Sequence, residues 1–219
     1  GKLGECAAGA VDTFSITTHD TVQIDATNPN APVCQDSSYT FPQQNLVFTG
    51  DGTLTYQWYL DGSPATALAN GADYSGVATD QLTIDSLSVG LAGDYFMVVT
   101  DGCGTADTSG IATITLETPP NAGTPGGSGL VCNDDAGGLN LFNLVAGEVV
   151  NPGDTWEEVG TAFSSGGGTF SGTNNEIIDV ASGPVPAGTY TFRFVALGTS
   201  CTNDTAEVTV EVVAPPADN

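Results

Sequence analysis

The chain has 219 residues, which is enough for two β-sandwich domains of about 100 residues each. Twenty-six Asp and Glu residues oppose only two basic residues, so the formal net charge is −24 at pH 7. This charge excludes nucleic acids and anionic membrane surfaces as partners, because it repels their phosphates. The sequence also contains no run of the roughly 18 apolar residues that a membrane span requires. Hydrophobic residues make up 40% of the chain, which is typical of a folded protein rather than an acidic tail.

Residues 1–28 look like the final hairpin of a preceding β-sandwich. The run Leu3-Gly4-Glu5-Cys6 and the alternating apolar residues after it resemble Leu197-Gly198-Thr199-Ser200-Cys201 and its following strand. We therefore expect Cys6 to be an orphan here, with its partner upstream of residue 1. In the alternative, residues 1–28 add strands to the next domain and Cys6 is a free thiol.

The rest of the chain alternates short apolar runs with turn residues, and helical periodicity is absent. Alternating or β-branched runs bounded by Gly, Asp, Asn and Pro are typical of strands. Such runs cover residues 54–60, 81–84, 95–100, 111–116, 190–195 and 206–213. Short strands separated by turns predict an all-β fold of tandem β-sandwiches.

Cysteines mark an internal repeat. Both halves of the chain open with Val-Cys-x-Asp, at Cys34 and Cys132, and both carry Ala-Gly-x-Tyr before a second cysteine, Cys103 or Cys201. The two cysteines of each half are 69 positions apart. This spacing predicts the disulfides Cys34–Cys103 and Cys132–Cys201. Paired cysteines indicate an oxidising, extracellular compartment.

A Pro-rich stretch, Thr118-Pro119-Pro120-Asn121-Ala122-Gly123, separates the halves. The predicted domains are residues 29–118 and 119–219. The final residues, Ala214-Pro215-Pro216-Ala217-Asp218-Asn219, resemble the start of another such junction, so we expect a further domain to follow.

The first full domain resembles the bacterial immunoglobulin-like domains that occur in tandem in large surface and secreted proteins of the Bacteroidota. The resemblance rests on Tyr56-Gln57-Trp58-Tyr59-Leu60-Asp61-Gly62, Asp80-Gln81-Leu82-Thr83-Ile84, Ala92-Gly93-Asp94-Tyr95 and Gly102-Cys103-Gly104. It implies that Trp58 fills the centre of the sandwich and that Tyr95 is the corner tyrosine. Met97 stands where antibody domains carry an inter-sheet cysteine, so that core disulfide is missing.

The second domain resembles another module of the same proteins. Its marks include Leu139-Asn140-Leu141-Phe142, Gly153-Asp154-Thr155-Trp156 and Ala187-Gly188-Thr189-Tyr190-Thr191-Phe192. The resemblance places Trp156 and Tyr190 in its core.

Proteins of this kind are typically adhesins or long cell-surface filaments exported by the type IX route. The resemblance therefore implies a non-enzymatic segment of an extracellular bacterial adhesin or filament, giving reach and adhesion. Its implied partners are neighbouring Ig-like domains of the same chain or fibre, together with surface glycans or host and substrate surfaces.

Two alternatives stay open. In the first, the chain is a self-polymerising fibre subunit, with residues 1–28 completing a neighbour's sheet by strand addition. In the second, it is a carbohydrate-binding module of a secreted enzyme, for which Tyr59, Tyr74 and Phe163 are the candidate platform residues.

Residues that could carry chemistry are few. His19 is the only imidazole and has no partner motif, so no catalytic residues are predicted. Calcium is the one cofactor that the sequence favours, because it takes oxygen ligands from loops and would relieve the repulsion of a −24 surface. The candidate ligands are Asn133, Asp134 and Asp135.

Overall fold

The computed structural model describes residue 15 and residues 18–24, 29–44, 46–181, 183 and 185–215. Cys6 and most of the segment 1–28 lie outside the described residues. By compactness the chain forms two units. Unit 1 comprises Gly1–Pro29, Thr40–Thr83 and Asp94–Ala112, and unit 2 comprises Asn30–Tyr39, Ile84–Gly93 and Thr113–Asn219.

The described elements are almost all strands, as the turn-rich sequence predicts. Those of the first repeat are β1 (Val22–Ile24), β2 (Ala31–Cys34), β3 (Tyr39–Thr40), β4 (Leu46–Thr49), β5 (Thr55–Leu60), β6 (Thr66–Ala67), β7 (Tyr74–Ser75), β8 (Thr83–Ile84), β9 (Gly93–Thr100), β10 (Ala106–Thr108) and β11 (Ala112–Glu117). Those of the second are β12 (Thr124–Pro125), β13 (Ser128–Cys132), β14 (Leu139–Asn140), η1 (Leu141–Leu144), β15 (Val145–Ala146), β16 (Thr155–Glu158), α1 (Ala162–Ser165), β17 (Thr169–Ser171), β18 (Ile177–Asp179), β19 (Gly188–Ala196) and β20 (Asp204–Val213).

The first repeat forms a six-stranded sheet in the order β2-β11-β9-β5-β6, with β10 beside β9, and a three-stranded sheet β3-β8-β7. Alternation along β9 buries every second side chain and so presents one face of that strand to a core. Trp58 and Tyr95 are fully buried there, and the Phe41 ring lies 5.1 Å from the Trp58 ring and 5.4 Å from the Tyr95 ring. The Trp58 indole N–H donates to the Thr79 carbonyl at 3.0 Å, which satisfies its one polar atom.

Residues 22–24 pair with the first repeat. β1 runs antiparallel to β4, and Val22 and Ile24 are buried while Gln23 between them is exposed. The Ile24 N–H also donates to the Asp107 carboxylate at 2.9 Å. The alternation of these three residues gives them one apolar face, which they bury where β1 pairs with β4.

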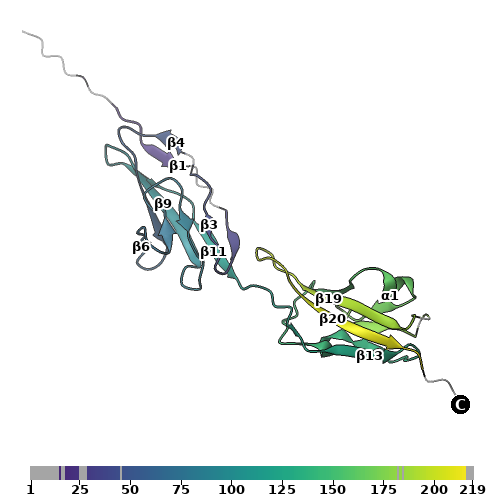
Figure 1. Cartoon of the computed structure of the whole chain (residues 1–219). Helices are drawn as coiled ribbons and strands as arrows, with labels where there is room; N and C mark the ends of the chain where they lie inside the picture. Colours follow the sequence, from purple (N-terminus) through teal and green to yellow (C-terminus); the bar gives the residue numbers. More distant parts are fainter. Residues whose placement is uncertain are drawn as a thin grey trace, which may run out of the picture. The chain divides into compact units, whose positions relative to one another are not determined.

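The second repeat forms a four-stranded sheet, β13-β20-β19-β16, a three-stranded sheet, β14-β18-β17, and the short pair β12-β15. The long strands β19 and β20 lie side by side with β13 next to β20 (Figure 1). Trp156, Phe163, Phe192 and Phe194 lie in one buried cluster, and the Phe163 and Phe192 rings meet edge to face at 5.0 Å.

Tyr190 differs from the core position that the resemblance implies. It is only partly buried, and its ring packs at the margin of the cluster, 5.6 Å from the Phe163 ring. Its hydroxyl donates to the Pro186 carbonyl at 2.7 Å. A tyrosine hydroxyl that bonds to the backbone a few residues upstream is the contact of a corner tyrosine, and Tyr190 makes it in the second repeat.

In both repeats the strand that ends in the first cysteine pairs in parallel with the last strand of the repeat. β2 runs parallel to β11 and places Cys34 opposite Glu117, and β13 runs parallel to β20 and places Cys132 opposite Val213. Each strand cysteine therefore lies beside the end of the last strand of its own repeat.

The second core should depend strongly on Phe192. Replacing Phe192 by Ala removes a fully buried ring, and we expect a loss of about 3–5 kcal/mol in the unfolding free energy of the second sandwich. Leu130→Ala is the matched control, since Leu130 is 66% exposed on β13, and it should change stability by less than about 0.5 kcal/mol. Urea unfolding followed by Trp156 fluorescence in a Trp58→Phe background measures both; equal effects of the two variants would contradict the assigned core.

Candidate functional site

The structure corrects the predicted disulfide pairing. Cys34 is bonded to Cys201, with the two Cα atoms 4.8 Å apart, whereas Cys103 and Cys132 are exposed free cysteines. The bond joins Cys34, at the end of β2 in the first repeat, to Cys201, in the loop between β19 and β20 of the second repeat. We call Cys34 and Cys132 the strand cysteines of the two repeats, and Cys103 and Cys201 the hairpin cysteines. Both partners belong to unit 2.

The parallel register explains why the predicted pairs do not form. Cys132 lies opposite Val213 at the end of β20, whereas Cys201 lies just before β20 begins at Asp204. Ten strand residues at about 3.3 Å each separate these positions by roughly 30 Å, far beyond the roughly 7 Å that a disulfide spans. The equal spacing of 69 therefore identifies equivalent cysteines and not bonded ones.

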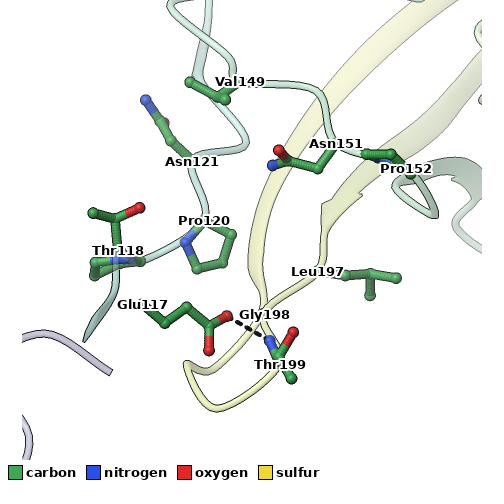
Figure 2. A pocket seen from close by; sticks show the side chains of 11 residues that line it. Glu117, Thr118, Pro120, Asn121, Val149, Asn151, Pro152, Leu197, Gly198 and Thr199 are labelled. Atoms are coloured by element: carbon green, nitrogen blue, oxygen red, sulfur yellow. Dashed lines mark hydrogen bonds between the residues drawn. The ribbon is translucent and has the colours of Figure 1, made fainter. Parts of the chain in front are cut away.

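A carboxylate binds the same hairpin. Glu117, the register partner of Cys34, accepts hydrogen bonds from the Thr199 and Ser200 N–H groups at 2.5 Å each, from the Cys201 N–H at 3.3 Å and from the Ser200 hydroxyl. Its side chain points at the loop between β19 and β20 (Figure 2). Because register neighbours on parallel strands point the same way, Cys34 and Glu117 together attach one hairpin tip at two points.

These bonds change the acidity of Glu117. The Ser200 hydroxyl contributes most, followed by the Thr199 and Ser200 N–H groups, and together they lower the pKa of Glu117 from its ordinary value of 4.5 to about 2. Glu117 therefore stays ionised, and bound to the hairpin, throughout the neutral and mildly acidic range.

Two further residues shape the hairpin tip. The buried carboxylate of Asp154 accepts from the Leu197 N–H at 2.8 Å and from the Asn151 N–H at 2.6 Å, which fixes the start of the loop. A side chain at Gly198 would come within 2.3 Å of the Cys201 carbonyl oxygen, so the loop needs glycine there. The roles of Glu117 and Asp154 cannot be predicted from the sequence, because acidic residues are common in this chain and only the fold brings these two to a loop.

A cleft of about 580 Å³ lies beside this attachment. It is lined by Glu117, the Pro-rich junction, Val149, Asn151, Pro152 and the loop residues 197–199. Figure 2 shows Pro120, Asn121 and Leu197 around it. The prolines fix φ along one wall, so the junction is stiff where it approaches the hairpin.

Cys103 is held in a comparable loop. The buried Asp101 carboxylate accepts from the Cys103 N–H at 3.0 Å and from the Thr105 N–H at 2.9 Å, and the Thr105 hydroxyl also donates to it. The Thr105 hydroxyl bond is the main cause of a lowered pKa for Asp101. The loop is therefore ordered while its thiol faces solvent.

The predicted calcium ligands Asn133, Asp134 and Asp135 directly follow β13. Asp135 accepts the Gly137 N–H at 2.9 Å, and Asp134 is exposed. In the part of the chain that the structure describes, no group of three or more His, Cys, Asp or Glu side chains could hold a metal ion.

The other candidates are placed as follows. Phe163 is 1% exposed and belongs to the core, and Tyr74 lies with its hydroxyl 3.2 Å from that of Tyr95. Tyr59 stacks on Phe96, with their ring centres 5.1 Å apart, on the face of β5 and β9 opposite Trp58. His19 pairs with the Asp51 carboxylate at 2.5 Å, and both side chains are about half exposed.

Comparison with known proteins places the fold. No family model matches the chain, and none of the curated proteins matches it. Among solved structures, a mutated three-domain Ig fragment of titin is similar at a TM-score of 0.59 and 15% identity, covering 90% of this chain and 67% of that one. An I-band fragment of titin gives 0.58 and 16%, covering 88% and 66%. Ig domains 1–5 of Sidekick-1 give 0.57 and 14%, covering 90% of this chain and 40% of theirs.

These similarities show the fold. The chain is a tandem of Ig-like β-sandwiches, which confirms the predicted fold class. It spans about two thirds of the titin fragments and less than half of the Sidekick-1 fragment.

The attachment by Glu117 should titrate in acid. Because the pKa of Glu117 is lowered on folding, its contribution is complete above about pH 4.5 and is lost as the pH falls through about 2. The amide signals of Thr199 and Ser200 in NMR spectra should move with a midpoint near that lower value. Glu117→Gln should abolish this transition and speed amide hydrogen exchange at both residues several-fold.

Glu211→Gln is the matched control, because Glu211 is exposed on β20 of the same unit. It should leave the transition and the exchange rates unchanged. A midpoint near 4.5 in the unaltered chain would contradict the assigned bonds.

Proposed function

We propose that the chain is a non-enzymatic, force-bearing segment of an extracellular bacterial adhesin or filament built from tandem Ig-like domains. The observation that carries this proposal is the Cys34–Cys201 disulfide between the two repeats. The tandem Ig-like fold is consistent with an adhesion or structural segment.

The disulfide determines which parts of the chain carry a pulling force. It closes a loop of the chain between two cysteines that are 167 positions apart in the sequence. Tension applied at the two ends passes from Cys34 through the sulfur–sulfur bond to Cys201, because a covalent bond does not extend. The chain between these cysteines lies off the force path and cannot be extended while the bond is intact.

The extracellular, bacterial setting is supported by separate observations. Disulfides persist in oxidising compartments, and the motif order resembles surface proteins of the Bacteroidota. No helix in the described part of the chain has the length and apolar character to cross a membrane. Neighbouring Ig-like domains are the partners that we propose, with glycans or other surfaces as targets of adhesion.

The fibre-subunit alternative has less support. It needs residues 1–28 to complete the sheet of another subunit, whereas residues 22–24 pair with β4 of their own chain. The carbohydrate-binding alternative needs a cluster of exposed aromatic rings, and of its three candidates Phe163 is core and Tyr74 packs edge-on against buried Tyr95.

Single-molecule stretching tests the proposal. The chain is held at residues 1 and 219 and extended with and without a reductant. In the oxidised chain the segment between Cys34 and Cys201, a sequence separation of 167, should stay hidden, and reduction should add about 600 Å of contour length at about 3.6 Å per residue.

Two variants make the result specific. Cys34→Ser should give the long extension without reductant, and the double variant Cys103→Ser/Cys132→Ser should keep the short one, because it leaves the bond intact. A long extension in the oxidised, unaltered chain would overturn the force-bearing function.

A further inference from the structure

Two exposed thiols occupy positions at which the equivalent cysteines are bonded. Cys132 corresponds to Cys34, and Cys103 corresponds to Cys201, by their order in the repeat. Cys34 and Cys201 form a disulfide, whereas Cys132 and Cys103 are free and exposed. The Cys34–Cys201 bond therefore indicates the kind of partner that each free cysteine can bond: a strand cysteine bonds a hairpin cysteine of another repeat.

The strand cysteines are equivalent in backbone geometry as well as in sequence. Each lies opposite the last residue of the final strand of its repeat, which is Glu117 for Cys34 and Val213 for Cys132. The residue after each cysteine donates its N–H to the carbonyl of that partner, at 2.8 Å for Gln35 and 2.9 Å for Asn133. The third residue after each cysteine donates back to the cysteine carbonyl, at 3.2 Å and 3.0 Å. Cys132 is therefore presented in the way that Cys34 is.

The two hairpin cysteines both lie in loops that a buried aspartate holds in place. Cys201 lies in the loop between β19 and β20, and Cys103 lies in the loop between β9 and β10. A buried aspartate fixes each loop, Asp154 through the Leu197 N–H and Asp101 through the N–H groups of Cys103 and Thr105. Each loop therefore holds one cysteine in an ordered position.

The chain beyond the final strand of each repeat is also similar. Thr118-Pro119-Pro120 follows Glu117, and Ala214-Pro215-Pro216 follows Val213. A junction of the same composition thus leads away from each repeat. One difference is that Val213 replaces the carboxylate of Glu117, so a hairpin beyond the second repeat would be attached by the disulfide alone.

We propose that Cys132 bonds the hairpin cysteine of a following Ig-like module of this kind, and that Cys103 bonds the strand cysteine of a preceding one. The modules are then linked by a ladder of disulfides, each from a strand to the next hairpin. This inference rests on the proposed function as a segment of an array.

The bond forms by thiol–disulfide exchange. The Cys132 thiolate attacks a small disulfide such as oxidised glutathione, forming a mixed disulfide and releasing one thiolate. The partner thiolate then attacks the Cys132 sulfur and releases the second. Two protein thiols lose two electrons and two protons, and one glutathione disulfide becomes two thiols.

A second copy of the chain serves as the probe. In a Cys6→Ser background, the variant Cys132→Ser keeps only the hairpin thiol Cys103, and the variant Cys103→Ser keeps only the strand thiol Cys132. Each is incubated alone, and both are mixed, in glutathione buffer. The solution holds about 1 M salt, at which the screening length is about 3 Å and the −24 charges repel little. Non-reducing mass spectrometry measures the products.

The mixture should give a disulfide dimer joined from Cys132 of one copy to Cys103 of the other, about tenfold above the dimer of either variant alone. A mixture that stays monomeric, or variants that dimerise alone as readily as the mixture, would overturn the ladder. The stretching experiment includes the double variant Cys103→Ser/Cys132→Ser, whose outcome does not depend on these two thiols. Failure of the ladder therefore leaves the force-bearing function standing, and failure of the stretching experiment is seen separately.

Discussion

The parallel pairing of the first edge strand with the last strand is the constraint on which the rest depends. It fixes where a cysteine at the end of the first strand must lie, namely beside the end of the last strand and away from the hairpin that precedes that strand. A strand cysteine and a hairpin cysteine of one repeat are thus held apart by the length of the strand. They can form disulfides only between repeats, and Cys34–Cys201 is such a bond.

Because the chain is so acidic, several of its carboxylates are bound by backbone N–H groups of loops rather than by basic side chains. With two basic residues against 26 acidic ones, ion pairs can satisfy few of them. Among the described residues, Arg193 contacts Glu207 and Glu157 across the sheet. Elsewhere the carboxylates accept backbone N–H groups in loops, as Glu117, Asp101 and Asp154 do. Charge-assisted bonds of this kind are short and strong, so loops that lack apolar cover still have one conformation.

Much of the fold follows from the sequence, because strand alternation and turn residues are local signals. The buried Trp58, Tyr95 and Trp156 lie at inward-facing positions of their strands, where alternation places a large apolar residue. The disulfide could not be predicted, because spacing reports which cysteines are equivalent and says nothing of strand direction. Glu117 could not be predicted either, since its partners lie more than 80 residues away and are backbone N–H groups, which every sequence contains.

The same physics explains why the hairpin tip needs two kinds of attachment. A disulfide fixes one pair of atoms but leaves rotation about its bonds, so Cys34 alone would allow the loop to turn. The carboxylate of Glu117 accepts from three successive residues, which fixes the orientation of the backbone from Thr199 to Cys201. In the proposed force-bearing segment the covalent bond transmits the tension, and the hydrogen bonds to Glu117 set the orientation of the loop. Because Glu117 is the register neighbour of Cys34, one pair of adjacent residues on β2 and β11 supplies both functions.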